Sequence, residues 1–454
     1  MEKLQLRQIA GAVGAACTGE VEIERVVTDT SQVAPGSLFV AIKGERFDGH
    51  DFIPKAAAEG ASAILAERDV EADVPVLRVA STRKALLDLA AWYRSLFHTF
   101  VAGVTGSVGK TSTKDMISSV LGRKGKTLKT QGNLNNGIGL PKTLLGLDAS
   151  YQNAVIEMGM SHKGEISQLT RAAQPSVGVI TNIGVSHIEN LGSQENILSA
   201  KLEIMEGMSA NAPLVLNADD PLLADVCNRI ERDILYYGIE SALAEVRATE
   251  ISELEDRTEF NIRYYGRTVS AMIPAIGRHN VYNALAAFSV GLTAGMASED
   301  IVAGLRSYEP SAMRQNIIRK DGMTVILDCY NASPDSMRAS LSVLAGLKSS
   351  RRIAVLGDML ELGGNSPQMH RQVGEYAAGK GLDAVFGYGP RAAELLAGAA
   401  EKGCPETRHF DDKAGLAAFL KTYLREGDAV LYKASRGMAL EEAVEMVHGI
   451  RAGH

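Results

Sequence analysis

Short apolar runs alternate with helical segments through the middle of the chain. The segments between the runs carry apolar residues at helical spacing, as in 110–121. Four runs have the length and composition of buried strands: 100–105, 153–157, 177–181 and 213–217. Strands and helices that alternate at this spacing predict a mostly parallel sheet with helices on both of its faces.

The flanking regions show related patterns. Segment 240–269 is more polar and alternating, which predicts an antiparallel edge, and a helix opens at 277. Residues 1–80 mix short elements, with a helix predicted at 4–12, strands at 21–27, 37–42, 61–65 and 76–79, and a helix that Ser81 caps and that runs to about 98. A new alternation starts after about 311, with strands predicted at 324–328, 352–357, 384–388 and 429–432.

At 454 residues, the chain is too long for one ordinary hydrophobic core. We therefore predict an α/β protein of three domains. These are a small α/β domain at 1–82, a central domain with a mostly parallel sheet at 83–311, and a Rossmann-like domain at 312–454.

Composition narrows the class of protein. Hydrophobic residues make up 46% and charged residues 22%, as in soluble globular proteins. The formal net charge is −7 and no basic run occurs, so the sequence predicts no nucleic-acid partner. The sequence shows no signal-peptide pattern and no membrane-length apolar run. Four widely spaced cysteines lack a CxxC pair, which favours free thiols in the cytoplasm.

The segment after the first central strand predicts a phosphate-binding turn. Gly106-Ser107-Val108-Gly109-Lys110-Thr111-Ser112 joins that strand to a helix. Glycines let backbone N–H groups approach phosphate oxygens, and a helix N-terminus favours negative charge. Lys110 would then reach the β/γ-phosphates of a nucleoside triphosphate, and Thr111 would offer its hydroxyl to Mg²⁺. Position 104 is Val where the general pattern has Gly, so a tight turn without nucleotide is the alternative.

Two further candidates lie at or after predicted strand ends, and a third, Lys201, lies in a helical stretch. Glu157 ends the second strand, where its carboxylate could join Thr111 on Mg²⁺; a salt-bridged structural glutamate is the alternative. His187 follows the third strand beside the phosphate turn, which makes it a candidate metal ligand or an ordinary loop histidine. Composition alone makes Lys201 an exposed helical lysine.

Several motifs together resemble the Mur ligases. They are collinear and run from about residue 28 to 441, almost the whole chain. The motifs that carry the resemblance are Thr105-Gly-Ser-Val-Gly-Lys-Thr111, Gly132-Asn-Leu-Asn-Asn-Gly-Ile-Gly-Leu-Pro141, Glu157-Met-Gly-Met-Ser-His-Lys-Gly-Glu-Ile166, Asn182-Ile-Gly-Val-Ser-His-Ile-Glu-Asn-Leu-Gly192, Gly277-Arg-His-Asn-Val-Tyr-Asn283, Met313-Arg-Gln-Asn316, Asp328-Cys-Tyr-Asn-Ala332 and Leu356-Gly-Asp-Met-Leu-Glu-Leu-Gly363.

The resemblance implies a UDP-binding N-terminal domain, a central P-loop ATPase domain and a C-terminal domain. It assigns the first metal to Glu157 and the second to His187 and Lys201, and Lys201 resembles the family's carbamylated lysine. Residues implied on the nucleotide are Asn280 and Asn283 at the adenine, and Arg314 and Asp328 from the C-terminal domain. Residues implied on the substrates are Thr30, Ser31, Asn136, Asn331, Lys433, Ser435 and Arg436.

Three positions depart from the family pattern. Ser31 stands where relatives commonly have Arg, so one basic contact to the UDP-sugar is missing. Ser333 replaces the usual Asn, which bears on recognition of a dipeptide, and Ala434 replaces the usual Gly. None of them touches the ATP chemistry.

The motifs at 313–316, 328–332 and 356–363 resemble those of the family member that adds D-alanyl-D-alanine to UDP-N-acetylmuramoyl-tripeptide. The implied reaction is ATP- and Mg²⁺-dependent amide ligation in the cytoplasm by a monomer, with an acyl phosphate as intermediate. One alternative is a Mur-like ligase with a different acid or amine. Another is a nucleotide-dependent switch, which would not require the second-metal residues His187 and Lys201.

Overall fold

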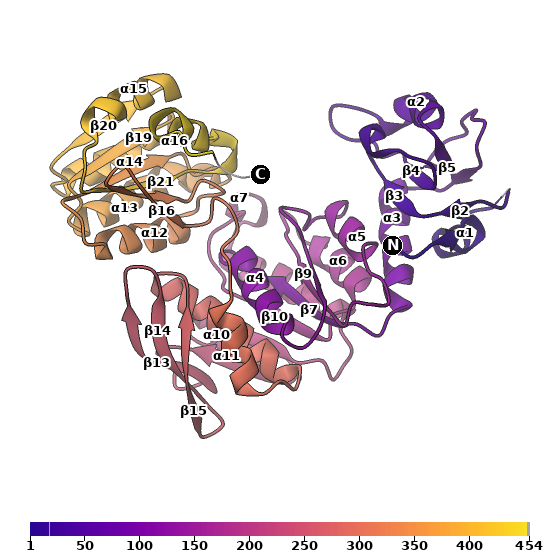
Figure 1. The fold of residues 1–454 in the computed structure, drawn as a ribbon, viewed down its shortest axis with the longest axis horizontal. Coiled ribbons are helices and arrows are strands. Elements are labelled where there is room, and N and C mark those ends of the chain that lie inside the picture. Colours follow the sequence, from indigo (N-terminus) through magenta and orange to yellow (C-terminus); the bar gives the residue numbers. More distant parts are fainter. Residues whose placement is uncertain (18, 452–454) are drawn as a thin grey trace. The chain divides into compact units, whose positions relative to one another are not determined.

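The computed structural model describes residues 1–17 and 19–451. The chain divides into two compact units, which are described separately. Unit 1 comprises Met1–Thr105, Leu121–Val179 and Ala200–Leu214. Unit 2 comprises Gly106–Val120, Ile180–Ser199 and the chain from Val215 onward. Figure 1 gives the element labels used below.

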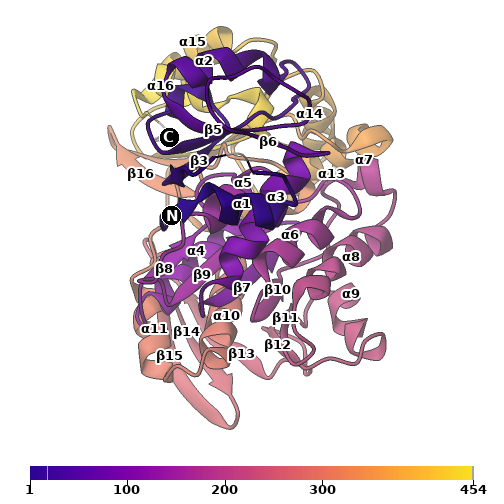
Figure 2. The ribbon, with the colours of Figure 1, turned by 90° about the vertical axis from the view of Figure 1, so that its right-hand side faces the viewer.

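Unit 1 begins with a small α/β layer (Figure 2). Its four-stranded sheet is parallel and has the order β3-β4-β5-β6. The strands of this region are β1 Leu4–Gln5, β2 Glu22–Ile23, β3 Arg25–Val27, β4 Ser37–Val40, β5 Ala61–Ala66 and β6 Val76–Arg78. The helices are α1 Leu6–Val13, α2 Ile53–Ala58 and α3 Thr82–Ser95.

Helix α3 connects this layer to the rest of unit 1. Ser81 caps it as predicted, because its hydroxyl accepts a hydrogen bond from the Lys84 backbone N–H at 3.4 Å. Tyr93 is fully buried on the helix, and its hydroxyl donates to the Leu147 carbonyl at 2.7 Å and accepts from the Glu2 N–H at 2.6 Å. One phenol therefore ties the chain start and a central-region loop to the same helix.

The rest of unit 1 carries central strands in the order β10-β7-β9-β8. β7 pairs in parallel with β9, and β8 does the same from the other side. The strands are β7 Phe100–Thr105, β8 Thr127–Lys129, β9 Asn153–Glu157 and β10 Val177–Ile180. The helices are α5 Gly139–Leu144 and α6 Glu165–Ala173, followed later by the 3₁₀ turn Glu203–Gly207.

Unit 2 contains the remaining central elements. β12 pairs in parallel with β13, and β13-β14-β15 form the antiparallel edge that the alternation predicted. The strands are β11 Leu214–Asn217, β12 Ile234–Gly238, β13 Val246–Glu253, β14 Thr258–Tyr264 and β15 Arg267–Ile273. The helices are α4 Lys110–Leu121, α7 Ile188–Leu191, α8 Gln194–Leu202, α9 Pro221–Ala224, α10 Arg278–Thr293 and α11 Ser298–Arg306. Helix α8 crosses the division, since its residues from Ala200 onward belong to unit 1.

The C-terminal part of unit 2 has a six-stranded sheet of order β16-β17-β21-β18-β19-β20. All its pairs are parallel except β16 with β17. The strands are β16 Asn316–Lys320, β17 Met323–Leu327, β18 Arg351–Gly357, β19 Ala384–Tyr388, β20 Thr407–Phe410 and β21 Asp428–Lys433. The helices are α12 Pro334–Gly346, α13 Ser366–Gly379, α14 Ala392–Glu401, α15 Lys413–Tyr423 and α16 Glu441–His448.

Helices cover both faces of this sheet (Figure 1). On β18, Ala354 and Leu356 enter the core beneath α12–α14, while Ile353 and Val355 enter the core beneath α15 and α16. Successive strand residues point to opposite faces, so a continuous apolar run is what a doubly covered sheet requires. The predicted α/β class is confirmed.

The pattern missed β8, β12, β16 and β20. β8, β16 and β20 are edge strands, and their sequences (TLK, NIIRK, TRHF) are short or rich in polar residues. An edge strand has one sheet neighbour and more contact with water, so it lacks the apolar run by which the central strands were found. No described helix is long and apolar enough to cross a membrane.

A buried histidine makes the stability of this sheet depend on pH. His448 lies in α16, is 4% exposed, and its Nε2 lies 2.9 Å from the Tyr432 hydroxyl. Burial lowers the pKa of His448 from 6.5 to about 4. Between these values the unfolded chain binds a proton that the folded chain does not, so stability falls as the pH drops through this range.

His448→Gln keeps an acceptor for the Tyr432 hydroxyl but has no proton to gain. We expect the melting temperature of the wild type to fall more steeply than that of the variant between pH 6.5 and 4. Thermal unfolding followed by circular dichroism measures both slopes. Parallel slopes would show that His448 does not contribute to the pH dependence.

Candidate active site

The predicted phosphate turn joins β7, which ends at Thr105, to α4, which begins at Lys110. Gly106 has φ +147° and Gly109 has φ +86°, a region that favours glycine. Space requires glycine as well. A Cβ on Gly106 would lie 1.8 Å from Thr181 Oγ1, and one on Gly109 would lie 2.8 Å from Asn283 Oδ1.

The loop after β10 holds this turn in place. The Ser107 and Val108 N–H groups donate to the carbonyl and side-chain oxygens of Asn182, at 3.0 and 2.9 Å. Thr181 Oγ1 donates to the Val108 carbonyl at 2.6 Å, and the Gly184 N–H donates to Ser107 Oγ at 2.9 Å. The protein's own hydrogen bonds thus fix the conformation of the turn, and a fixed turn loses less conformational entropy when it binds a ligand.

Lys110 lies across the turn. Its Nζ donates to the Gly106 carbonyl at 2.8 Å and to the Ser107 carbonyl at 3.2 Å. Thr111 and Ser112 follow in the first turn of α4. The backbone N–H groups in the first turn of a helix point toward its N-terminus, not to carbonyls of a preceding turn. A cation and N–H groups that converge on one glycine-rich turn make a site suited to phosphate.

Two predicted adenine-side residues lie on α10, close to the turn. Asn283 is 6% exposed, and its Oδ1 accepts a hydrogen bond from Thr113 Oγ1 in α4 at 3.0 Å. Asn280 is 5% exposed, and its Oδ1 accepts from Asn283 Nδ2 at 3.2 Å. The structure thus brings these asparagines together with the helix that follows the phosphate turn.

Glu157 and Lys201 belong to unit 1, and both are 2% exposed. Glu157 ends β9 as predicted, and its Oε1 accepts from Asn135 Nδ2 at 2.8 Å. Lys201 lies in the last turn of α8. The compositional interpretation of Lys201 as an exposed lysine is therefore wrong, and its role as a metal ligand stays a prediction.

His187 belongs to unit 2 and precedes α7 in the left-handed conformation, with φ +62°. Its Nδ1 lies 2.8 Å from Glu361 Oε2, although the angles do not make a hydrogen bond. The neighbouring His187 holds the pKa of Glu361 below its usual range. A carboxylate from the motif 356–363 thus contacts the predicted metal ligand.

Metal binding by these residues is a prediction. Among residues 1–17 and 19–451, no group of three or more His, Cys, Asp and Glu side chains is arranged to hold a metal ion. Mg²⁺ bound with a triphosphate takes only one or two protein oxygens beside water and phosphate. The Thr111 hydroxyl and the Glu157 carboxylate are oxygen donors of the kind that this ion prefers.

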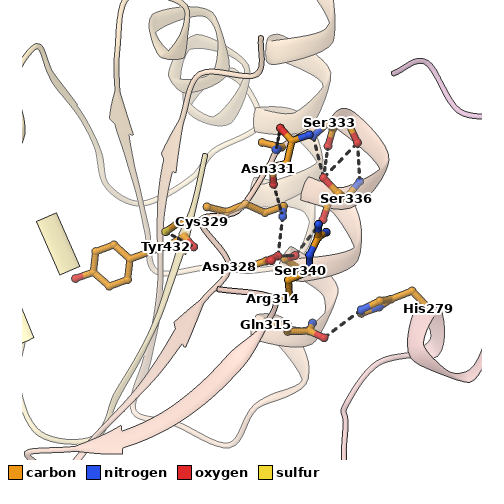
Figure 3. A network of polar contacts seen from close by, with 12 residues as sticks. His279, Arg314, Gln315, Asp328, Cys329, Asn331, Ser333, Ser336, Ser340 and Tyr432 are labelled. Carbon is orange, nitrogen blue, oxygen red and sulfur yellow. Dashed lines mark hydrogen bonds and ion pairs between the residues drawn. The ribbon is translucent and has the colours of Figure 1, made fainter. Parts of the chain in front are cut away.

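Asp328 and Lys433 form a polar centre at the end of the C-terminal sheet (Figure 3). Lys433 Nζ lies 2.6 Å from Asp328 Oδ2 and donates to the Asn331 carbonyl at 3.0 Å. Ser340 Oγ donates to the same Asp328 oxygen at 2.6 Å. Asp328 directly follows β17 and Lys433 ends the neighbouring parallel strand β21, so both lie at the carboxyl-terminal edge of the sheet.

The other C-terminal residues surround this centre. The guanidinium of Arg314 stacks on the Tyr330 ring, 3.9 Å from its centroid. Ser435 Oγ accepts from the Leu360 N–H at 2.9 Å, so it braces the motif 356–363. Arg436 forms an ion pair with Glu441.

Two predicted substrate positions support local structure in unit 1. Asn136 Oδ1 accepts from the Ile138 and Gly139 N–H groups, at 3.1 and 2.9 Å, and so holds the turn that leads into α5. Thr30 and Ser31 form a 3₁₀ turn that Asp29 caps at 2.9 Å. Hydrogen bonds from Ser31 hold the pKa of Asp29 below its usual range. Substrate contact by these residues stays a prediction.

Sequence reasoning missed Asn182, Glu361 and Gln315 as individual residues. Each lies inside a motif that was singled out, but motif matching does not say which polar side chain supports another. Asn182 carried a usable signal, because it comes directly after a predicted strand. In the structure that strand, β10, lies beside β7, which leads into the phosphate turn.

Comparison with known proteins agrees with this arrangement. The sequence matches the Mur ligase middle domain at 104–291, the Mur ligase glutamate ligase domain at 313–436, and the Mur ligase family catalytic domain at 22–94. It is 41% identical, over 93% of both chains, to a Bacillus subtilis protein named UDP-N-acetylmuramoyl-tripeptide--D-alanyl-D-alanine ligase. This chain belongs to the Mur ligase family. The resemblance stated from the motifs is confirmed.

Solved structures extend the Mur ligase likeness to the whole fold. MurF from Acinetobacter baumannii is 33% identical with a TM-score of 0.93, covering 98% of this chain and 99% of that one. MurF from Thermotoga maritima in complex with ADP is also 33% identical, with a TM-score of 0.85 and coverage of 93% and 97%. The predicted Mur-type three-domain plan is confirmed, while the boundaries at 82/83 and 311/312 stay predictions.

Lys110→Ala tests the phosphate turn of this Mur ligase. Loss of a cation from a transferring phosphoryl group raises the barrier by about 3 kcal/mol or more, so turnover should fall by about two orders of magnitude. Phosphate release during ligation measures the effect, and circular dichroism checks the fold. Lys421→Ala removes an exposed lysine from α15 and serves as the control. Near-normal turnover in a folded Lys110→Ala variant would refute the assignment.

Proposed function

We propose that this chain joins D-alanyl-D-alanine to UDP-N-acetylmuramoyl-tripeptide in an ATP-dependent reaction and so makes a pentapeptide precursor of peptidoglycan. The observation that carries the proposal is the Bacillus subtilis relative with that name, which is 41% identical over 93% of each chain. The prepared phosphate turn supports use of ATP, as does the ADP complex of the Thermotoga maritima neighbour.

The chemistry needs an activated acid. The terminal carboxylate of the tripeptide attacks the γ-phosphorus of ATP, an acyl phosphate forms and ADP leaves. The free amine of D-alanyl-D-alanine then attacks the carbonyl carbon, and phosphate leaves as the amide forms. Positioning and neutralisation of charge, rather than covalent catalysis, supply most of the acceleration in such phosphoryl transfer.

Lys110 and Arg314 are the cations that we assign to this neutralisation. Lys110 already lies over the turn, where γ-phosphate oxygens can replace the two carbonyls that it contacts. Arg314 stacks on Tyr330, and we assign its guanidinium to the phosphates from the C-terminal side. Lys433 is buried and pairs with the partly buried Asp328. We assign Lys433 to the incoming amine and Asp328 to the nucleotide.

Mg²⁺ would lower the negative charge on the phosphates. We assign the first ion to Thr111 and Glu157, and the second to His187 and Lys201. A lysine ammonium cannot ligate a metal, because it carries donors only. Burial of Lys201 to 2% exposure supports a modified side chain, because a carbamate made from its amine and CO₂ would be anionic and offer oxygen ligands.

We place the reaction in the cytoplasm and assign it to a monomer. Substrate contacts are assigned to Thr30 and Ser31 at the UDP end, to Asn136, and to Asn331, Ser435 and Arg436 near the amine. A Mur-like ligase with a different acid or amine is disfavoured, because the relatives that match almost the whole chain share one name.

The amine substrate has a direct test. Enzyme, ATP, Mg²⁺ and UDP-N-acetylmuramoyl-tripeptide should release one phosphate per pentapeptide when D-alanyl-D-alanine is added. Mass spectrometry identifies the product, and a coupled assay counts the phosphate. Assays without the tripeptide and with D-alanine alone are the controls. Faster turnover with the single amino acid would assign the chain to a different ligase activity.

Lys201→Ala tests the proposed carbamate. The variant should be nearly inactive and should recover partly with short carboxylic acids, which can place a carboxylate in the vacated space. Lys402→Ala, at an exposed site at the end of α14, should show neither effect. A carbamate signal from ¹³C-bicarbonate in the NMR spectrum of the wild type, absent in Lys201→Ala, is independent of activity. Wild-type turnover in Lys201→Ala would disprove the role.

A further inference from the structure

Gln315 joins the start of the C-terminal region to helix α10 (Figure 3). It directly precedes β16, which begins at Asn316. Its side-chain Oε1 lies 3.1 Å from His279 Nε2 and accepts from Asn280 Nδ2 at 2.9 Å. A carbonyl oxygen can only accept, so His279 carries a proton on Nε2 in this arrangement. Gln315 thus fixes two adjacent side chains in the first turn of α10.

This contact sets the orientation of Asn280. One N–H of its amide donates to the Ile276 carbonyl at 2.9 Å, and Nδ2 also donates to Gln315. With two acceptors on the nitrogen side, the amide oxygen must face the other way, where it accepts from Asn283 Nδ2 at 3.2 Å. Removing Gln315 would leave a buried N–H of Asn280 without this acceptor.

From Asn283 the polar contacts continue to the phosphate turn. Asn283 Oδ1 accepts from Thr113 Oγ1 at 3.0 Å, one turn into α4. The same oxygen is the atom that leaves no space for a Cβ on Gly109. An unbroken chain of hydrogen bonds therefore runs from Gln315 through Asn280 and Asn283 to the helix that begins at Lys110.

On its other side, Gln315 is part of the segment that carries Arg314. Met313 and Gln315 both have positive φ, +57° and +54°, which non-glycine residues adopt only when their surroundings enforce it. Ser311 Oγ donates to Asp115 Oδ2 of α4 at 2.5 Å. The segment is thus pinned to α4 at Ser311 and to α10 at Gln315, with Arg314 between them.

We propose that Gln315 is a positioning residue that couples the nucleotide site to the linker bearing Arg314. Its amide oxygen orients Asn280 and Asn283 against the phosphate turn, and the same contact holds the strained linker in which Arg314 stands. The inference rests on the proposed ATP site. It adds that hydrogen bonds couple the linker to the nucleotide site, so nucleotide affinity depends on a residue outside the phosphate turn.

Gln315→Leu removes the acceptor at similar size, whereas Gln315→Glu keeps it. We expect Gln315→Leu to weaken ADP binding by about five- to tenfold, the effect of losing one acceptor of a buried donor. Gln315→Glu should stay within about twofold of the wild type, since a carboxylate oxygen accepts both contacts. Gln372→Leu makes the same change at an exposed site on α13 and should have no effect.

Isothermal titration calorimetry with ADP, without peptide substrates, gives these affinities independently of ligation. A wild type that does not bind ADP would refute the proposed ATP site itself. If the wild type binds ADP and Gln315→Leu has an unchanged Kd, only the role of Gln315 falls. A loss in Gln315→Glu as large as in Gln315→Leu would also overturn it. In steady-state assays, Gln315→Leu should raise KM for ATP and lower kcat, and Gln315→Glu should restore both.

A double-mutant cycle tests the continuity of the chain. Thr113→Val removes the hydroxyl that donates to Asn283 at the far end. If the contacts act as one unit, ADP binding by the double variant Thr113→Val/Gln315→Leu should be weakened by less than the product of the two single effects. Independent, multiplicative losses would overturn the coupling. Should Gln315→Leu fail to fold, the same cycle with Gln315→Ala, and the Kd of Gln315→Glu, decide the question.

Discussion

The structure depends on a close approach of backbone at the turn between β7 and α4. Thr181 and Asn283 lie so close to Gly106 and Gly109 that neither glycine has room for a Cβ atom. Because the two glycines carry no side chain, the loop after β10 and helix α10 can pack directly against the turn over which Lys110 lies. The turn is thus defined as much by the residues that press on it as by its own sequence.

The residues that press on the turn come from segments far away in the sequence. Thr181 and Asn182 hold its backbone from the loop after β10. Asn283 of α10 accepts a hydrogen bond from Thr113 in the helix that follows the turn. Ser311 and Gln315 then connect the same helices to the first residues of the C-terminal region. These polar contacts therefore connect the phosphate turn to the segment that leads into the C-terminal sheet.

Much of this fold could be predicted from sequence, because buried strands and capped helices leave local signals. β7, β9 and β19 were predicted to the residue, as was the Ser81 cap. Edge strands β16 and β20 were missed for want of an apolar run. The burial of Lys201 and the contacts of Gln315 could not be predicted, because they depend on residues that only the fold brings together, such as Asn280, 35 positions from Gln315.

Lys110 has a further consequence for product release. Two carbonyl oxygens of its own turn hold the ammonium at 2.8 and 3.2 Å. When phosphates leave, these two carbonyl oxygens can accept the hydrogen bonds of the Lys110 ammonium, so the cation keeps acceptors. The Gly106 and Ser107 carbonyl oxygens and a phosphate ligand can thus replace one another as acceptors for the Lys110 ammonium. Release of a phosphate ligand is therefore opposed less strongly than it would be at a turn that offered its lysine no carbonyl acceptor.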